Sequence, residues 1–306
     1  MRFNCLQFHR PVNRAFVFLF MGLLLLTACR ATAVSVNPST TAAQRSVQNK
    51  GSDTMVNIAL AWAEAYRKVD STISVAVTGG GSGTGIAALI NGTVDMANAS
   101  RAMKQDEIDQ ALANGVEPVE HAVAIDALAV IVNLENPVSE LTIDQLADIY
   151  TGRITNWQEV GGNDAPIVLL SRETNSGTHV YFLEEVVRKG NGDNRDIFAP
   201  QTLLMPSSVG ITSEIRRNPN AIGYDGLGYV DVAHEKMIAV AKDSANPFVL
   251  PSVATAASGE YPLSRDLFMY ITANPSRVVI NYLNWILSAE GQTIVAQLGF
   301  VPLVSE

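Results

Sequence analysis

From Lys50 onward the chain alternates short apolar segments with amphipathic ones, and this alternation limits the possible folds more than any other feature. Apolar residues at helical spacing predict a helix over residues 55–69, and strict alternation over residues 73–77 predicts a strand. A long apolar run at residues 121–133 predicts a buried strand. Strands that alternate with helices are typical of an α/β fold built on a mostly parallel sheet.

The second half of the chain continues this pattern. Thr142, followed three residues later by Gln145, predicts a capped helix that reaches Tyr150. The apolar spacing predicts that helices also close the chain, over part of residues 264–270 and over residues 275–287 and 290–298.

One short motif occurs three times, each time directly before a predicted helix. The first turn is Gly51-Ser52-Asp53-Thr54, the second is Gly81-Ser82-Gly83-Thr84 and the third is Asn175-Ser176-Gly177-Thr178. At a helix start about four backbone N–H groups lack helical partners, and the helix dipole adds partial positive charge. One such motif is ordinary helix capping, but three in one α/β chain, two of them rich in glycine, predict a site for a tetrahedral oxyanion.

Two arginines follow predicted strands near these turns, and either guanidinium could bind such an anion with two hydrogen bonds. Arg172 lies four residues before Ser176, and Arg101 follows residues 94–100. The formal net charge of −9 argues against a nucleic-acid partner.

The motifs of several enzyme classes are missing from the sequence. The second turn lacks the lysine of a phosphate-binding nucleotide loop and the spacing of a dinucleotide fingerprint or a nucleophile elbow. The histidines lack zinc-ligand spacing. We therefore predict no catalytic residue, metal or cofactor; His179 is the histidine closest to a turn.

The N-terminus has the features of an export signal. Basic residues precede an apolar stretch at residues 15–26, and Leu26-Thr27-Ala28-Cys29 resembles the lipobox of bacterial lipoproteins. The resemblance implies a signal peptide over residues 1–28, a lipid on Cys29 and an extracytoplasmic location; an uncleaved anchor is the alternative. Residues 29–48 are rich in Ala, Ser, Thr and Val, which predicts a flexible tether.

Several motifs in order along residues 49–304 resemble the PstS-type substrate-binding lipoproteins of phosphate ABC transporters. They are the three turns with Arg172, Ala99-Ser100-Arg101, the segment Ile149-Tyr150-Thr151-Gly152-Arg153-Ile154-Thr155-Asn156-Trp157, and Asn220-Ala221-Ile222-Gly223-Tyr224. The resemblance implies a type II periplasmic-binding-protein fold, in which two α/β lobes joined by two crossing strands close on one phosphate. It implies a monomer that is not an enzyme and that delivers phosphate to a membrane permease. We expect lobe 1 at residues 49–125 and 238–306, lobe 2 at 126–237, and crossing strands near 124–129 and 230–241.

The resemblance also assigns phosphate-binding positions. They are Ser52, Thr54, the amide of Met55, Ser82, Gly83, Arg172, Ser176, Gly177 and Thr178, with Arg101 as a second candidate guanidinium. Many family members have an aspartate after the Ala-Ser pair, which accepts the phosphate proton and repels sulfate. Here Arg101 occupies that place, so we expect the acceptor to be Asp126, with Asp53 as the second choice.

Three other functions remain open from the sequence. The ligand could be another tetrahedral oxyanion, such as sulfate or molybdate. The chain could be a phosphohydrolase that uses His179 as the base for a nucleophilic serine. The same two lobes could also serve adhesion or sensing.

Overall fold

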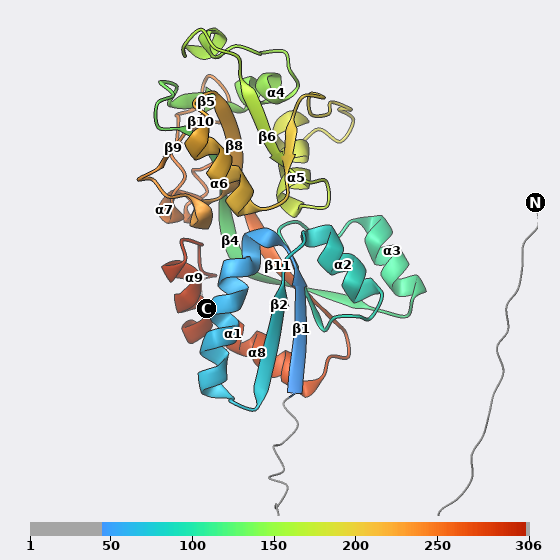
Figure 1. Ribbon diagram of the computed structural model, residues 1–306. Coiled ribbons are helices and arrows are strands. Elements are labelled where there is room, and N and C mark those ends of the chain that lie inside the picture. The colour runs from blue at the N-terminus through green and yellow to red at the C-terminus, as the bar shows by residue number, and fades with distance from the viewer. Residues whose placement is uncertain (1–44, 304–306) are drawn as a thin grey trace, which may run out of the picture. The chain divides into compact units, whose positions relative to one another are not determined.

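The computed structural model describes residues 45–303 (Figure 1). Within that range, nine strands form one hydrogen-bonded sheet in the order β2-β1-β3-β11-β4-β8-β6-β7, with β9 also paired to β4. A separate ladder joins β10 to β5. The sheet therefore runs without interruption through two groups of elements, which we call the first and second lobes.

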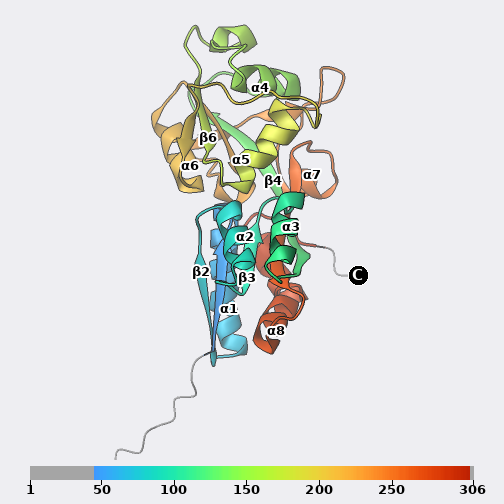
Figure 2. The same ribbon diagram turned by 90° about the vertical axis from the view of Figure 1, so that its right-hand side faces the viewer.

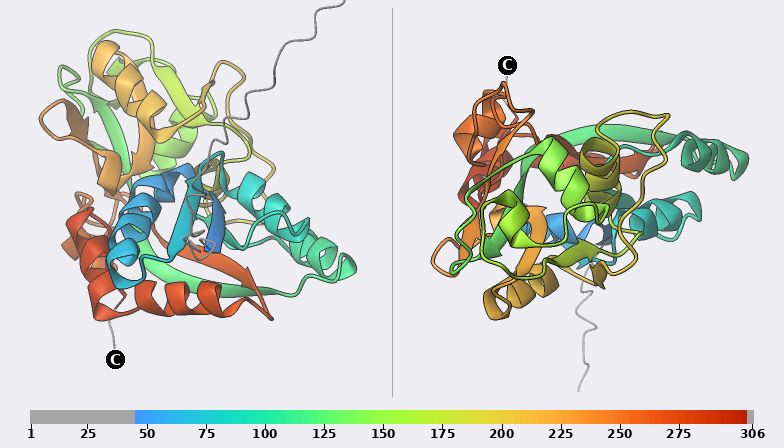
Figure 3. Two further views of the ribbon diagram at one scale, coloured as in Figure 1. Left: turned by 60° about the horizontal axis from the view of Figure 1, so that its bottom comes forward. Right: turned by 90° about the horizontal axis from the view of Figure 1, so that it is seen from above.

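The first lobe places helices on both faces of its part of the sheet. Its elements are β1 (Arg45–Gly51), α1 (Val56–Val69), β2 (Ile73–Thr78), α2 (Ser82–Ile90), β3 (Met96–Ala99), α3 (Gln105–Ala113), the start of β4 (Pro118–Asn133), the end of β11 (Ser264–Thr272), α8 (Arg277–Ile286) and α9 (Ala289–Gln297). Helices flank this part of the sheet in Figure 3. Neighbouring residues of β11 point to opposite faces: Met269 packs with α1, α8 and α9, and Tyr270 packs with α2 and α3.

The second lobe contains the rest of β4 and the elements that follow it. They are β5 (Glu140–Thr142), α4 (Ile143–Tyr150), β6 (Val168–Arg172), α5 (Gly177–Phe182) with the π-helical turn Leu183–Val187, β7 (Leu203–Met205), α6 (Ser208–Arg217), β8 (Ala221–Gly226), β9 (Glu235–Met237), β10 (Ala239–Ala241) and α7 (Val253–Ala257). Short 3-10 turns cover Asp53–Met55, Trp157–Val160 and Leu227–Tyr229. α6 packs on one face of β6 and β8, and α4 and α5 pack on the other (Figure 2). The predicted capping box at Thr142 and Gln145 starts α4.

The chain crosses between the lobes along β4 and β11, which are antiparallel neighbours (Figure 1). On β4, Ala124 belongs to the core of the first lobe and Ala127 to that of the second. Leu263, just before β11, belongs to the core of the second lobe, and Leu267 on β11 belongs to that of the first. The crossing therefore lies within four residues of each segment.

The predicted return to lobe 1 at residue 238, through a crossing strand at 230–241, is wrong. β10 pairs with β5, and Ile238 and Val240 are buried in the core of the second lobe. The chain instead stays in the second lobe through α7 and Tyr261, because both pack on that same core.

Three further expectations about local structure also need correction. Residues 264–272 are β11 and not a helix, because this segment pairs with both β3 and β4 and its apolar side chains are buried on both faces of the sheet. The sheet is mixed and not mostly parallel, since β4 and β11 run against their neighbours. β1 begins at Arg45, inside the predicted tether, because Val47 is buried and this segment pairs with β2.

A buried polar network links three elements of the second lobe. Arg172, at the end of β6, donates from Nη1 to Ser208 Oγ on α6 at 3.0 Å. Ser208 Oγ donates in turn to Asp225 Oδ1 on β8 at 2.9 Å. Burial raises the pKa of Asp225 to about 6, although the Arg172 charge and hydrogen bonds from the Gly226 amide and Ser208 oppose this.

We predict that the ionisation of Asp225 lowers stability as the pH rises. Its folded pKa, about 6, lies above its ordinary value of 3.8. Its stabilising contribution is therefore fully present below about pH 4 and is lost as the pH rises through about 6, by roughly 3 kcal/mol in total. Urea unfolding of wild type and Asp225→Asn between pH 4 and 8 measures this effect. As the pH rises, the free energy of unfolding should increase in the variant relative to wild type, because Asn does not titrate. A difference between the two proteins that does not change with pH would contradict the prediction.

Candidate functional site

The three turns meet where the two lobes face each other. Thr54 Oγ1, in the first turn, lies 2.9 Å from Thr178 Oγ1 in the third, and both residues are buried. The amide of Gly83, in the second turn, donates to the carbonyl of Asn175 in the third at 3.0 Å. Turns that are distant in sequence thus lie in contact with one another.

Serine hydroxyls connect the first two turns within the first lobe. Ser100 Oγ is 3.1 Å from Ser52 Oγ and 3.2 Å from Ser82 Oγ, and the Ser100 amide donates to Ser82 Oγ at 3.0 Å. A Cβ atom on Gly177 would lie 2.5 Å from both Ser82 Oγ and Ser100 Oγ. A larger residue at position 177 would therefore displace these two hydroxyls from their present positions.

The local sequence explains how two of the turns form. Gly81 has φ 89°, a conformation that glycine adopts without strain, and α2 begins at the next residue. In the third turn, Ser176 Oγ accepts a hydrogen bond from the Thr178 amide at 3.2 Å and caps α5. The remaining predicted amide donor, that of Met55, donates to the Ser52 carbonyl at 3.1 Å, and its side chain lies in the core of the first lobe.

Asp126 and Arg265 form a buried ion pair beside the turns, on the two crossing strands. They are direct cross-strand partners of β4 and β11. Arg265 Nη2 is 2.9 Å from Asp126 Oδ2 and also donates to Thr178 Oγ1 at 2.9 Å. Burial raises the pKa of Asp126, and the Arg265 charge opposes that shift.

This ion pair leaves two buried polar atoms unused. Asp126 Oδ1 and Arg265 Nη1 make no hydrogen bond within the described residues, although the side chains are 0% and 4% exposed. A buried donor or acceptor without a partner costs about 1–3 kcal/mol. Eleven buried side-chain atoms of the described residues lack a partner, but Asp126 and Arg265 form the one ion pair among these residues in which each side chain has such an atom. Asp126 Oδ1 could therefore accept a hydrogen bond from a ligand, and Arg265 Nη1 could donate one.

Arg172 reaches the first turn across the lobes. Its Nη2 forms an ion pair with Asp53 Oδ2 at 2.8 Å, and its Nε donates to the Met205 carbonyl at 3.3 Å. Asp53 Oδ1 in turn accepts from the Gly80 amide at 2.9 Å. Each guanidinium nitrogen of Arg172 thus has a protein partner, and Asp53 acts as its counter-ion.

Arg101 makes its ionic contacts inside the first lobe. Its Nη1 and Nη2 bind the two carboxylate oxygens of Glu107 at 2.7 and 2.6 Å, and Nη1 also donates to the Ala102 carbonyl. The paired Arg101 charge lowers the pKa of Glu107 against the opposing effect of burial. The Arg101 charge is therefore balanced by α3.

His179 lies inside the second lobe, away from the serines of the turns. Its Nδ1 is 3.0 Å from Ser171 Oγ on β6, and its ring packs against Phe198. Burial lowers its pKa. Because Ser171 also bonds to the Tyr224 hydroxyl within the core, this pair does not present a nucleophile to a substrate.

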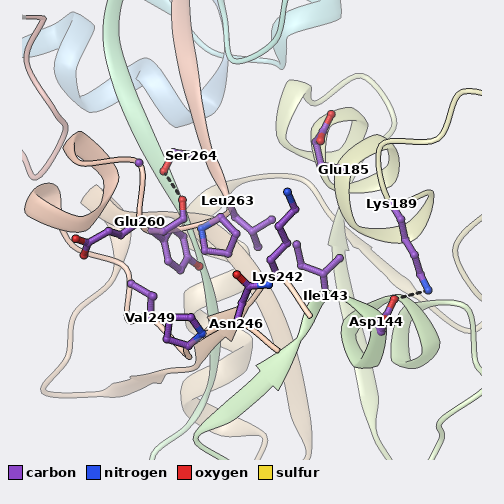
Figure 4. Close-up of a pocket in the computed structure, with 14 residues that line it drawn as sticks. Ile143, Asp144, Glu185, Lys189, Lys242, Asn246, Val249, Glu260, Leu263 and Ser264 are labelled. Atoms are coloured by element: carbon purple, nitrogen blue, oxygen red, sulfur yellow. Dashed lines mark hydrogen bonds and ion pairs between the residues drawn. The ribbon is translucent and has the colours of Figure 1, made fainter. Parts of the chain in front are cut away.

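A cavity of about 900 Å³ lies elsewhere in the second lobe (Figure 4). Lys189, which pairs with Asp144, and Lys242 line it together with the carboxylates of Glu185 and Glu260. Three carboxylates against two ammonium groups do not favour an oxyanion, so the meeting point of the turns is the better candidate site.

Two kinds of feature are absent from residues 45–303. In this range no three His, Cys, Asp or Glu side chains gather in a group able to hold a metal ion. No helix of the same range has both the length and the apolar character needed to cross a membrane. Cys29 and the predicted signal peptide lie outside the described residues.

Sequence reasoning missed Arg265 and Ser100 as members of the site. Arg265 was placed in an expected helix, which hid its pairing with Asp126. The unbroken apolar run at residues 267–271 was the signal for a buried strand, and an antiparallel pairing with residues 118–133 would have brought the two side chains together. Ser100 belongs to the Ala99-Ser100-Arg101 motif, in which the sequence drew attention to the arginine and not to the serine.

Known proteins resemble this chain over most of its length. The family model described as a PBP superfamily domain matches residues 37–290. The phosphate-binding protein PstS of Pseudomonas aeruginosa is 34% identical over 83% of this chain and 81% of its own length.

Solved structures agree with this match. A Clostridium perfringens protein solved with bound phosphate has a TM-score of 0.76 and 33% identity, covering 85% of this chain and all of that one. An ABC-type phosphate transport receptor from Vibrio cholerae has a TM-score of 0.67 and 30% identity, covering 84% of this chain and all of that one. The chain therefore belongs to the PstS-like family of the PBP superfamily.

Proposed function

We propose that this protein is the extracytoplasmic substrate-binding component of a phosphate ABC transporter. It binds inorganic phosphate between its two lobes and passes it to the membrane permease. The observation that carries this proposal is the meeting of three donor-rich turns, from both lobes, beside an ion pair with one donor and one acceptor left unused. The names of the relatives, which are binding proteins and transport receptors, support binding over catalysis.

The donors around the meeting point suit a tetrahedral anion. The hydroxyls of Ser52, Ser82, Thr54 and Thr178 bond to other hydroxyls in this structure and can rotate toward an anion. The α2 and α5 starts add backbone N–H groups and partial positive charge. The bound phosphate would thus be held by directed hydrogen bonds.

Asp126 supplies the selectivity in this proposal. An ionised carboxylate only accepts hydrogen bonds, so Oδ1 can pair with the hydroxyl of a protonated phosphate. Sulfate carries no proton at neutral pH, and two anionic oxygens would then face each other. Asp53, the second choice, is already the counter-ion of Arg172.

The direct test is calorimetric titration of the folded chain with phosphate, arsenate, sulfate and molybdate at pH 7.5. We expect phosphate and arsenate to bind, and sulfate and molybdate to bind at least about 100-fold more weakly, because a buried acceptor faces an anion without a proton. Equal affinity for sulfate and phosphate would exclude a phosphate-selective site.

The role of Asp126 is tested by Asp126→Asn, because an amide can donate a hydrogen bond to sulfate. We expect the preference for phosphate over sulfate to fall by about tenfold or more. Glu235→Gln is the matched control, because Glu235 is also a buried carboxylate paired with an arginine, Arg216, at 2.7 Å. Its preference should match that of wild type; an unchanged preference in Asp126→Asn would remove Asp126 from the selectivity mechanism.

The membrane anchor in this proposal is the lipid on Cys29. In the native host, Cys29→Ser should prevent lipid attachment and move the protein from the membrane fraction to the soluble fraction, because a single thiol carries the predicted anchor. Fractionation and mass spectrometry of the mature N-terminus measure both effects. Retention of the Cys29→Ser protein in the membrane would support the uncleaved anchor instead.

A further inference from the structure

Arg265 lies at the point where the chain crosses between the lobes. Ser264 and Arg265 open β11, and Arg265 stands opposite Asp126 on β4. Its guanidinium carbon lies 5.2 Å from the centre of the Tyr181 ring, and the Tyr181 hydroxyl donates to the Ser264 carbonyl. Backbone pairing, an aromatic ring and an ion pair thus fix this side chain in one place.

The hydrogen bonds of Arg265 use only part of its guanidinium. Nη2 donates to Asp126 Oδ2 and to Thr178 Oγ1, each at 2.9 Å, and Nε reaches Asp126 Oδ2 at 3.3 Å. Nη1 is buried and has no partner within the described residues. Because a guanidinium donates in one plane, the contact of Nη2 with Thr178 directs this edge of the group toward the third turn.

Asp126 also has one atom without a partner, and that atom is a hydrogen-bond acceptor. Oδ2 accepts both hydrogen bonds from Arg265. Oδ1 has no partner at hydrogen-bond geometry among the described residues, although the Leu227 amide is near enough to the carboxylate to oppose the rise in the pKa of Asp126. A Cβ atom on Gly226 would lie 3.0 Å from both Asp126 Oδ1 and the Thr54 methyl carbon, so Oδ1 is close to the first turn. The ion pair therefore offers a free donor and a free acceptor within the same group of turns.

We propose that Arg265 binds the phosphate directly through Nη1, while Asp126 Oδ1 accepts the phosphate proton. Arg172 is then a positioning residue that holds the first turn through Asp53. This inference rests on the proposed phosphate-binding function and specifies which guanidinium contacts the anion.

The other two arginines of the region have their Nη groups occupied. Arg172 places Nη1 on Ser208 and Nη2 on Asp53 and the Pro206 carbonyl. Arg101 places both Nη groups on Glu107, and of its nitrogens only Nε, with a single N–H, is buried without a partner. Arg265 therefore has the largest unused donor capacity of the three.

A crystal structure of the wild-type chain with phosphate tests the contact without any substitution. We expect a phosphate oxygen within about 3.2 Å of Arg265 Nη1 and a second oxygen at hydrogen-bond distance from Asp126 Oδ1. A phosphate whose guanidinium contacts come from Arg172 or Arg101, with Arg265 bound only to protein, would overturn the inference.

Measurements of phosphate binding to Arg265→Lys test how much Arg265 contributes to the affinity. Lysine keeps the charge, but its single nitrogen cannot serve Asp126, Thr178 and the anion together. We expect the Kd for phosphate to rise about 10- to 100-fold, because this corresponds to the loss of one charge-assisted hydrogen bond. Phosphate should still be preferred over sulfate, because Asp126 is intact. Arg216→Lys is the control, since it alters a partly exposed ion pair with Glu235.

The outcomes separate this inference from the proposed function. If wild type does not bind phosphate, the proposed function fails. If wild type binds phosphate and a folded Arg265→Lys, judged by circular dichroism, binds it equally well, the function stands and the role of Arg265 is refuted. If affinity falls together with the preference over sulfate, Arg265 acts only by orienting Asp126, which also refutes the direct contact.

Discussion

The ion pair between Arg265 and Asp126 is the interaction on which the arrangement of the site depends. Removing two such charges from water costs several kcal/mol for each ion, and the pair offsets that cost only with close geometry and additional hydrogen bonds. The sheet supplies this geometry directly, because the two residues are opposite each other on antiparallel strands. The same strands carry the chain from one lobe to the other. The fold thus places a fixed pair of charges where the chain crosses between the lobes, independently of any ligand.

A continuous chain of polar contacts leads from this ion pair to both lobes. Asp126 binds Arg265, Arg265 binds Thr178 in the second lobe, and Thr178 contacts Thr54 in the first. The donors that join the lobes are therefore also those proposed for the ligand. A bound phosphate would replace hydrogen bonds between the lobes as well as adding new ones, so its affinity must be lower than a count of its contacts suggests. In the proposed function, the same replacement would link phosphate binding to closure of the lobes.

How much the sequence predicts depends on the range of the interactions involved. Local patterns identified most helices, the Thr142 cap and the three turns, because capping and apolar spacing act within a few residues. The return of the chain at residue 238 and the helix at residues 264–270 were wrong, because both depend on which distant strand a segment pairs with. Asp126 was singled out because a carboxylate in an apolar run needs a partner, but its partner lies 139 positions away. Asp53, the partner of Arg172, lies 119 positions away and likewise required the three-dimensional structure, whereas Glu107, the partner of Arg101, is only six positions away.

Each arginine of the site region is matched by its own carboxylate: Arg265 by Asp126, Arg172 by Asp53, and Arg101 by Glu107. The region is therefore close to neutral, in a chain whose formal charge is −9. Long-range attraction cannot hold an anion in such a protein, since charges beyond about 10 Å are screened in salt. Affinity must come from short hydrogen bonds to hydroxyls, amides and one guanidinium edge, which depend steeply on distance and angle. Separation of the lobes would break these bonds together, and no net positive charge would then delay release of the anion. A neutral, geometry-dependent site thus suits the proposed function, in which the anion is bound between the lobes and released when they separate.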